Sequence, residues 1–345
     1  MISSNYSVNP NSMPPQTNLL QMIMGYWVSQ CIYIAAKLGI ADLLQNGEQH
    51  SDTLASATNT NKDAMYRLLR ALASIGIFAQ TQPYYFKLTP LATYLQSDVP
   101  HSLKAVSIMF AEEHYQAWGN LMYSMQTGKN AFENLYGANI FEFYKQNHTS
   151  GEIFDQAMTD ISVIENIAVL AAYDFSSIDK LVDVGGGNGR LLSSLIQAHS
   201  AMTGVLFDQP DVIERAFDLV EKSGISDRLQ LVTGNFFETI PVGGDAYVLK
   251  HILHNWSNEQ AIAILKNCYQ AMVEPGRLLV IEMVIPPGNE PDPSKFLDIN
   301  MLVVCPGGRE RTQAEYEELF KAAGFKLTRI IPTVSDVSVI EGVKS

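Results

Sequence analysis

From Lys180 onward, apolar segments typical of β-strands alternate with segments of helical periodicity. Regular alternation of this kind predicts an α/β fold, in which helices cover both faces of a mainly parallel sheet. Strands are predicted at Lys180–Val184, Gly204–Phe207, Leu229–Val232, Ala246–Lys250, Arg277–Glu282, Lys326–Pro332 and Ser338–Glu341. Helices are predicted to begin near Gly189, Asp211, Ser257 and Thr312, the last two because Ser257–Gln260 and Thr312–Glu315 fit the capping-box pattern.

A glycine-rich turn, VDVGGGNGR, joins the first of these strands to the helix that follows. Glycines allow backbone amides to approach a ligand closely, and the start of a helix offers free N–H donors. A dinucleotide fingerprint beginning at Gly185 would require a sixth-position glycine where this chain has Arg190. The turn therefore indicates a nucleoside ligand other than NAD, although such a turn can also serve only to pack a helix on a strand.

Polar and aromatic side chains follow the ends of four further strands. Ligands bind at the carboxyl ends of strands in open α/β sheets, so these positions predict one shared site. They are Asp208, then Asn235 and Phe236, then Lys250, His251, His254 and Trp256, and finally Glu282. Asp208, about 20 residues beyond the glycine turn, suits the two hydroxyls of a ribose. A helix cap for Asp208, core packing for Phe236 and a buried structural role for His251 remain alternatives.

The net charge belongs to one part of the chain. Only 17% of the residues are charged and 47% are hydrophobic, which excludes a disordered protein. Residues 1–100 hold five basic and five acidic residues, so the whole net charge of −13 belongs to residues 101–345. A nucleic-acid-binding protein usually has a basic excess, so the balance disfavours that function and indicates two units with different roles.

The N-terminal part is predicted to be a separate module. Residues 1–18 are predicted to form a flexible arm, and residues 19–100 helices followed by a β-hairpin, a winged-helix pattern. Because this module is electrically neutral, we favour dimerisation over DNA binding. The charge-free run Leu19–Ala36 lacks the basic start of a signal peptide and is interrupted by polar residues, so we expect a helix buried in a core or against a second subunit.

Residues 101–345 are predicted to form the second domain, with an aromatic-rich helical segment at 101–175 and the α/β core at 176–345. Some of those aromatic residues could line an apolar pocket. The three cysteines are far apart and form no CxxC pair, which favours a cytoplasmic protein without a disulfide framework or zinc ribbon.

Six segments together resemble the plant and bacterial small-molecule O-methyltransferases. They are VDVGGGNGR, LFDQPDVIERA, GNFFETIP, LKHILHNWSNEQ, GRLLVIEMVIP and PGGRERTQAEYEELFKAAGF, in the order and spacing of that family. Caffeic acid and hydroxyindole O-methyltransferases are members. The resemblance, which extends from about Leu19 to the C-terminus, implies a Rossmann-like class I methyltransferase fold, S-adenosylmethionine as cofactor, no metal, and a homodimer interlocked through the N-terminal module.

The resemblance also implies roles for individual residues. His254 matches the general base, and Glu282 and Glu310 match the two carboxylates beside it. The cofactor is expected at Ser162, Asp183, Gly185, Gly187, Asp208, Asn235, Phe236, Trp256 and either Lys250 or His251. The acceptor is expected at Trp118, Phe154, Met158, Met301 and Cys305, each of which could equally be a core residue. Asn235, Asn255 and Asn258 stand where the family commonly has acids.

The expected reaction is methylation of a hydroxyl, most simply a phenol, on a small metabolite of secondary metabolism. A phenol with a pKa of about 10 is mostly protonated at neutral pH, and an imidazole with a pKa of about 6.5 can take its proton. Methylation of nitrogen or another reaction on a similar scaffold is the alternative, because fold and cofactor do not fix the acceptor. A winged-helix regulator without enzymatic activity is a third reading, disfavoured by the neutral module. The net charge of −13 disfavours a polyanionic acceptor.

Overall fold

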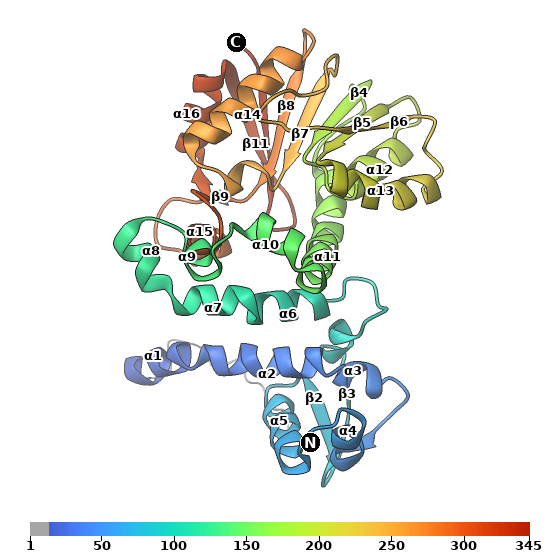
Figure 1. The fold of residues 1–345 in the computed structure, drawn as a ribbon, viewed down its shortest axis with the longest axis vertical. Coiled ribbons are helices and arrows are strands. Elements are labelled where there is room, and N and C mark those ends of the chain that lie inside the picture. The colour runs from blue at the N-terminus through green and yellow to red at the C-terminus, as the bar shows by residue number, and fades with distance from the viewer. Residues whose placement is uncertain (1–13) are drawn as a thin grey trace. The chain divides into compact units, whose positions relative to one another are not determined.

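The computed structural model describes residues 14–345, without the side chain of Asp218 (Figure 1). The chain divides into two compact units, of which the first ends at Glu112 and the second begins at Glu113. The sequence placed this boundary at residues 100 and 101. The first unit is longer because α6 (Lys104–Ala111) packs against α2 (Gly25–Lys37) and so belongs with the N-terminal helices.

The N-terminal unit consists of short helices and a small antiparallel sheet. The strand order is β1-β3-β2, and β2 and β3 form the hairpin that the sequence predicts. The three strands are β1 (Gln49–His50), β2 (Phe78–Gln82) and β3 (Tyr85–Leu88). Besides α2 and α6, the unit contains α1 (Pro15–Ile23), α3 (Ile40–Leu43), α4 (Ser51–Ala57), α5 (Lys62–Ser74) and the 3₁₀ turn Ala92–Leu95.

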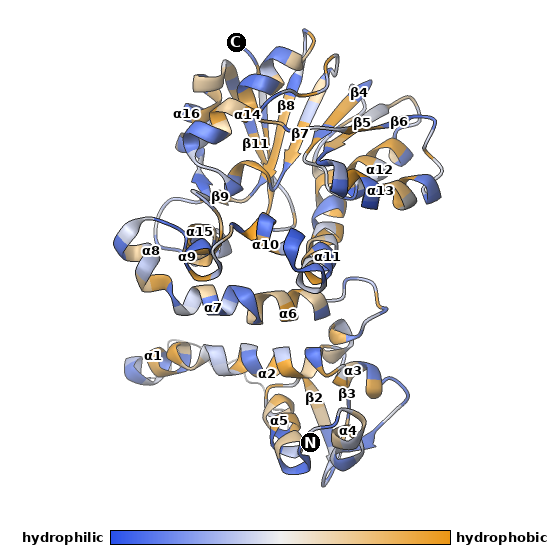
Figure 2. Cartoon of the chain, in the orientation of Figure 1, coloured by the Kyte–Doolittle hydropathy of each residue, from blue (hydrophilic) through white to orange (hydrophobic). Residues whose placement is uncertain are grey.

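The apolar run near the N-terminus forms two helices, α1 and α2, separated at Met24. Helix α1 begins at Pro15, a favoured first helical residue, so it takes in the last residues of the predicted arm 1–18; residues 1–13 of that arm lie outside the described residues. Hydrophobic residues, orange in Figure 2, recur along these helices. Several of their large apolar side chains are exposed, including Met22 at 69% and Trp27 at 54%. By length and composition alone, Pro15–Lys37 could cross a membrane. Of its 18-residue apolar window, 11% is buried in the described chain.

A seven-stranded sheet forms the centre of the second unit, in the order β11-β12-β8-β7-β4-β5-β6. The five strands from β8 to β6 are parallel, and β12 is antiparallel to both its neighbours. The strands are β4 (Lys180–Val184), β5 (Thr203–Asp208), β6 (Leu229–Thr233), β7 (Ala246–Lys250), β8 (Arg277–Glu282), β11 (Phe325–Pro332) and β12 (Ser338–Lys344). All seven predicted strands are confirmed to within a few residues at their ends.

Helices cover both faces of this sheet. Leu181 on β4 packs with α11 (His148–Ala172), α12 (Arg190–Ala198) and α13 (Pro210–Lys222). Its neighbour Val182 points to the opposite face and packs with α14 (Asn258–Ala271) and α16 (Gln313–Ala323). Strand side chains alternate between faces, so a continuous apolar run such as residues 278–281 of β8 is required where both faces are buried.

The segment before the sheet is helical, as predicted. Its helices are α7 (Glu113–Gly119), α8 (Leu121–Thr127), α9 (Ala131–Tyr136), α10 (Ile140–Gln146) and the long α11. Among the elements that were not predicted are α15 (Pro293–Val304) and the two-residue strands β9 (Val284–Ile285) and β10 (Arg311–Thr312), which pair in parallel. Helix α15 packs with α7 and α9, which explains why its apolar residues show little one-sided periodicity.

Both predicted capping boxes are present, and the one at Thr312 supports a testable prediction. The Thr312 hydroxyl accepts from the Glu315 N–H at 3.3 Å, and the Glu315 carboxylate accepts from the Thr312 N–H at 2.8 Å. Thr312→Ala removes the cap acceptor and should lower the free energy of unfolding by about 1 kcal/mol in urea denaturation. Thr312→Ser keeps a hydroxyl and is the control; equal losses in the two variants would contradict the capping role.

Candidate active site

The glycine turn after β4 holds its residues in conformations that favour glycine. Gly185 has φ +73° and Gly187 has φ +60°, both in the left-handed region. A Cβ atom on Gly187 would meet nothing within 4 Å, so open space lies beside its backbone. The Gly187 N–H donates to Asp208 Oδ2 at 2.9 Å, which brings the ends of β4 and β5 together. The two strand ends predicted to share a site therefore lie together.

Asp183 lies beneath this turn with an exposed fraction of only 1%. Its Oδ2 has no hydrogen-bond partner among the described residues. Burial, together with the nearby charge of Asp208, raises the pKa of Asp183 to about 7. Burial also raises the pKa of Asp208. The two carboxyls are shielded from water, Asp183 Oδ2 is free to accept a hydrogen bond, and open space lies beside the Gly187 backbone. These features fit a ligand with hydroxyl or amine donors, such as a nucleoside that carries an amino-acid chain.

The end of β6 contributes aromatic rings. Phe236, Phe237 and Trp256 pack edge to face, with 4.9 Å between the ring centroids of Phe237 and Trp256. The Asn235 side chain is used locally: its Oδ1 accepts from the Phe237 N–H at 3.0 Å, and its Nδ2 donates to Glu238 at 3.2 Å. Asn235 thus shapes the turn that presents these rings, and contact with an adenine stays a prediction.

Lys250 and His251, the two alternatives for the cation before the base, share one partner that the sequence analysis missed. Glu165 on α11 places Oε2 2.7 Å from Lys250 Nζ, and both of its oxygens lie 2.9 Å from His251 Nε2. Burial opposes ionisation of Glu165, yet the neighbouring His251 and Lys250 lower its pKa to about 2. No sequence motif pointed to Glu165, because it lies 85 residues before Lys250 on an otherwise ordinary helix.

His254 sits in the 3₁₀ turn Leu253–Asn255 and is 8% exposed. Its Nδ1 lies 2.7 Å from Glu310 Oε1, and its backbone N–H donates to Glu282 Oε1 at 3.0 Å. The β9–β10 pair brings the segment containing Glu310 alongside the end of β8, where Glu282 lies. The three residues predicted to act together are therefore in contact, with Glu310 on the imidazole and Glu282 on the backbone.

Opposing effects set the pKa of the His254 imidazole. Burial disfavours the charged form, but the interaction with Glu310 and the charge of Glu282 outweigh it and raise the pKa. Because Glu310 occupies Nδ1, Nε2 is the ring nitrogen left to exchange a proton. The arrangement of base and orienting carboxylate matches that of known hydrolytic triads.

Arg311 holds the backbone on both sides of His254. It is fully buried, and its guanidinium donates to the carbonyls of Leu253 at 3.0 Å and Trp256 at 2.9 Å. Tyr316 on α16 donates its hydroxyl to the second oxygen of Glu282. Sequence reasoning missed both residues although they lie in the last matching segment, because a position in a motif does not reveal what the side chain contacts.

Four of the five predicted acceptor residues belong to one apolar cluster. Trp118, Phe154, Met301 and Cys305 pack in it, and Met158 does not belong to that cluster. Trp118 Nε1 donates to the buried Asn300 at 2.8 Å. The thiol of Cys305 lies 3.4 Å from the Asn255 amide oxygen, next to His254. The cluster therefore reaches the residue that follows the imidazole.

Ser162, the remaining predicted cofactor residue, is half-buried on α11. One helical turn earlier, the Thr159 hydroxyl accepts from the Asn188 amide of the glycine turn at 2.7 Å, so this part of α11 lies beside the turn.

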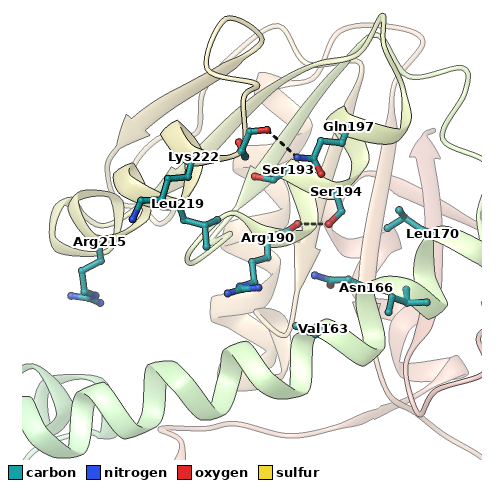
Figure 3. A pocket seen from close by; sticks show the side chains of 12 residues that line it. Val163, Asn166, Leu170, Arg190, Ser193, Ser194, Gln197, Arg215, Leu219 and Lys222 are labelled. Carbon is teal, nitrogen blue, oxygen red and sulfur yellow. Dashed lines mark hydrogen bonds between the residues drawn. The ribbon is translucent and has the colours of Figure 1, made fainter. Parts of the chain in front are cut away.

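A separate cavity of about 530 Å³ lies between α11, α12 and α13 and includes none of the predicted site residues (Figure 3). Within the described residues no group of three or more His, Cys, Asp and Glu side chains could hold a metal ion.

Comparison with known proteins identifies the family. An O-methyltransferase domain model matches residues 118–326, and an O-methyltransferase dimerisation domain model matches residues 20–98. The chain belongs to the O-methyltransferase family. The phenazine O-methyltransferase PhzM of Lysobacter antibioticus is 41% identical over 96% of each chain. The 8-amino-8-demethylriboflavin N,N-dimethyltransferase of Streptomyces davaonensis is 32% identical over 96% of this chain and 97% of its own.

The solved structure of a further methyltransferase supports the fold and the cofactor. Human N-acetylserotonin methyltransferase, in complex with S-adenosylmethionine, has a TM-score of 0.87 at 25% identity, covering 97% of this chain and 99% of its own. The second unit thus has the class I methyltransferase fold, accompanied by an N-terminal helical dimerisation domain. The chain is a small-molecule methyltransferase that uses S-adenosylmethionine.

The His254–Glu310 contact can be tested through the titration of the imidazole. In wild-type protein, NMR should find the pKa of His254 above the usual value of about 6.5, and Glu310→Gln should lower it. Because the folded pKa is raised, the contribution of His254 to stability is full below about pH 6.5 and is lost as the pH rises through the folded pKa. Glu317→Gln, an exposed change on α16, is the control. An unchanged His254 titration in Glu310→Gln would refute the coupling.

Proposed function

We propose that this protein transfers the methyl group of S-adenosylmethionine to a hydroxyl of a small aromatic metabolite, with His254 as general base. One observation carries the proposal: a buried imidazole held at Nδ1 by Glu310, at the carboxyl end of the sheet, next to an apolar cluster. Nε2 of such an imidazole is available to a proton donor entering from that cluster.

The reaction requires few functional groups. When bound, S-adenosylmethionine would supply an electrophilic methyl group, whose bond to sulfur is given up as the new bond forms, so that S-adenosylhomocysteine is left. Nε2 of His254 takes the hydroxyl proton as the acceptor oxygen forms its new bond to carbon, and Glu310 stabilises the resulting imidazolium. Glu282 holds the backbone N–H of His254, which fixes the position of the ring. Burial of the site excludes water and so keeps the nucleophile aligned rather than solvated.

The cofactor is proposed to lie across the strand ends from β4 to β7. Gly185 and Gly187 would face its methionine end and Asp208 its ribose, while Asp183 would supply its unused oxygen to a donor. Phe236 and Trp256 present aromatic surface suited to an adenine. Ser162 and Asn235 complete the proposed set. Lys250 or His251 would supply the cation that faces the cofactor, and both contact Glu165.

The acceptor is proposed to bind against Trp118, Phe154, Met301 and Cys305, with Met158 at the same segment of α11 as Phe154. Aromatic walls favour a flat apolar acceptor. The relatives named above act, by their names, on a phenazine and on a flavin amine, and both are flat ring systems. The second relative also makes methylation of an aromatic amine the alternative. Mass spectrometry of products from matched hydroxyl and amino acceptors separates the two.

The protein is proposed to act in the cytoplasm, as expected from its three separate cysteines, none of which forms a disulfide in the described structure. Formation of a homodimer is supported by the match to a dimerisation domain. The surface proposed for that contact is the exposed apolar side of α1 and α2.

Loss of His254 should separate catalysis from binding. His254→Gln removes the base and should lower the turnover of a hydroxylated acceptor by about 10²–10⁴-fold. The affinity for S-adenosylhomocysteine, measured by calorimetry, should stay within about twofold, since the imidazole acts on the acceptor. His199→Gln, after the end of α12, is the matched control. Unchanged turnover in His254→Gln would exclude it as the base.

The dimer surface predicts a change of mass. Trp27→Glu places a charge at a 54%-exposed apolar position of α2 and should shift the protein toward the monomer in light scattering at micromolar concentration. Val334→Glu, at a 96%-exposed position in the second unit, should leave the mass unchanged. A wild-type protein that is already monomeric, or a Trp27→Glu variant that remains dimeric, would reject this surface.

A further inference from the structure

A largely buried group of three ionisable side chains lies beside the proposed cofactor site without a role in methyl transfer itself. The Glu165 carboxylate contacts both Lys250 Nζ, at 2.7 Å, and His251 Nε2, at 2.9 Å. The side chains of Glu165 and Lys250 are each only 8% exposed. Isolating a charge from water is costly, so the two are retained as a pair only if each compensates the other.

The position of this pair places it next to the ligand rather than in the general core. Lys250 ends β7, one strand from the glycine turn that follows β4. The charge of Lys250 also acts on the buried Asp183 below that turn. His251, the next residue, has φ +54°, a left-handed conformation that few residues other than glycine adopt, and its ring centroid is 5.1 Å from that of His254.

S-adenosylmethionine carries a positive sulfonium, and a lysine ammonium close to it would weaken its binding. We propose that Glu165 is a positioning residue that holds Lys250 in place and cancels its charge, so that the site accepts a cationic cofactor. This inference rests on the proposed function, in which Lys250 faces the cofactor. Glu165 touches neither cofactor nor acceptor in this account and acts through Lys250 and His251.

The proposal predicts a difference between two ligands of nearly the same shape. S-adenosylhomocysteine lacks the methyl group and, with it, the positive charge. Glu165→Gln makes the site more positive by one unit while it keeps the size of the side chain. The loss should fall on S-adenosylmethionine, whereas a purely structural defect would weaken both ligands alike.

Calorimetry on the full-length protein measures the ratio of the two dissociation constants. In Glu165→Gln this ratio should change about tenfold against S-adenosylmethionine, the effect of a unit charge at about 10 Å in a medium of effective dielectric constant about 20. Glu341→Gln is the matched control: Glu341 is also a buried, ion-paired carboxylate whose pKa is lowered to about 2, but its partners are Arg329 and Tyr173. It should leave the ratio unchanged.

A second variant keeps the test decisive if Glu165→Gln fails to fold. Glu165→Gln/Lys250→Met removes both charges, so the ratio should return to within about twofold of the wild-type value. An altered ratio in this double variant, or an unaltered one in a folded Glu165→Gln, would overturn the proposal. If the wild-type protein bound neither ligand, the proposed cofactor site itself would be rejected. If the wild-type protein bound both ligands but the variants did not show the expected ratios, only the role of Glu165 would be rejected.

Discussion

The contact between His254 and Glu310 is the interaction on which the site depends. An imidazole 8% exposed would ordinarily lose its affinity for a proton, but a carboxylate at 2.7 Å restores it. Glu310 is itself buried, and its backbone N–H donates to Asp298 Oδ1 at 2.9 Å. This hydrogen bond fixes the backbone that carries the carboxylate. Arg311, the next residue, ties this segment to the carbonyls around His254. The base and its partner are thus held by one continuous network of hydrogen bonds.

The parallel sheet provides the place where this network meets a cofactor. Parallel strands end at the same edge, so Asp183, Asp208, Lys250 and Glu282 come together there although about 100 residues separate the first from the last. Buried ionisable side chains at this edge form pairs: Glu165 with Lys250, and Glu310 with His254. Each pair lowers the cost of keeping an ionisable group away from water.

The sequence predicted the architecture because the strands are apolar enough to be buried on both faces and the turns have specific chemistry. Lys180–Val184, Ala246–Lys250 and Arg277–Glu282 match the observed strands at both ends, and the boxes at Ser257 and Thr312 form as expected. Helix α15 escaped prediction because it packs against several helices and lacks a single apolar stripe. The end of α1 and start of α2 around Met24 were not predicted either, because apolar residues continue on both sides of Met24.

For the site, matching motifs predicted which residues gather, but not how they connect. His254, Glu282 and Glu310 are in contact as expected, yet nothing in the sequence showed that Glu310 takes the ring and Glu282 the backbone. Glu165 and Arg311 were not predicted at all, because long-range contacts of a single charged side chain leave no local pattern. For Asn235 the sequence predicted a contact with a ligand, and the structure shows in addition that its side chain makes hydrogen bonds to Phe237 and Glu238 within its own turn.

The central claim is that His254, with its pKa raised by Glu310, accepts the proton of the methylated group. The most direct measurement is the pH dependence of the single-turnover rate with a hydroxylated aromatic acceptor, in wild-type protein and in Glu310→Gln. The account predicts a wild-type rate that rises with pH to a midpoint above about 6.5, and a midpoint moved to lower pH in the variant. A midpoint that is the same in both proteins, or a rate independent of pH across this range, would contradict it.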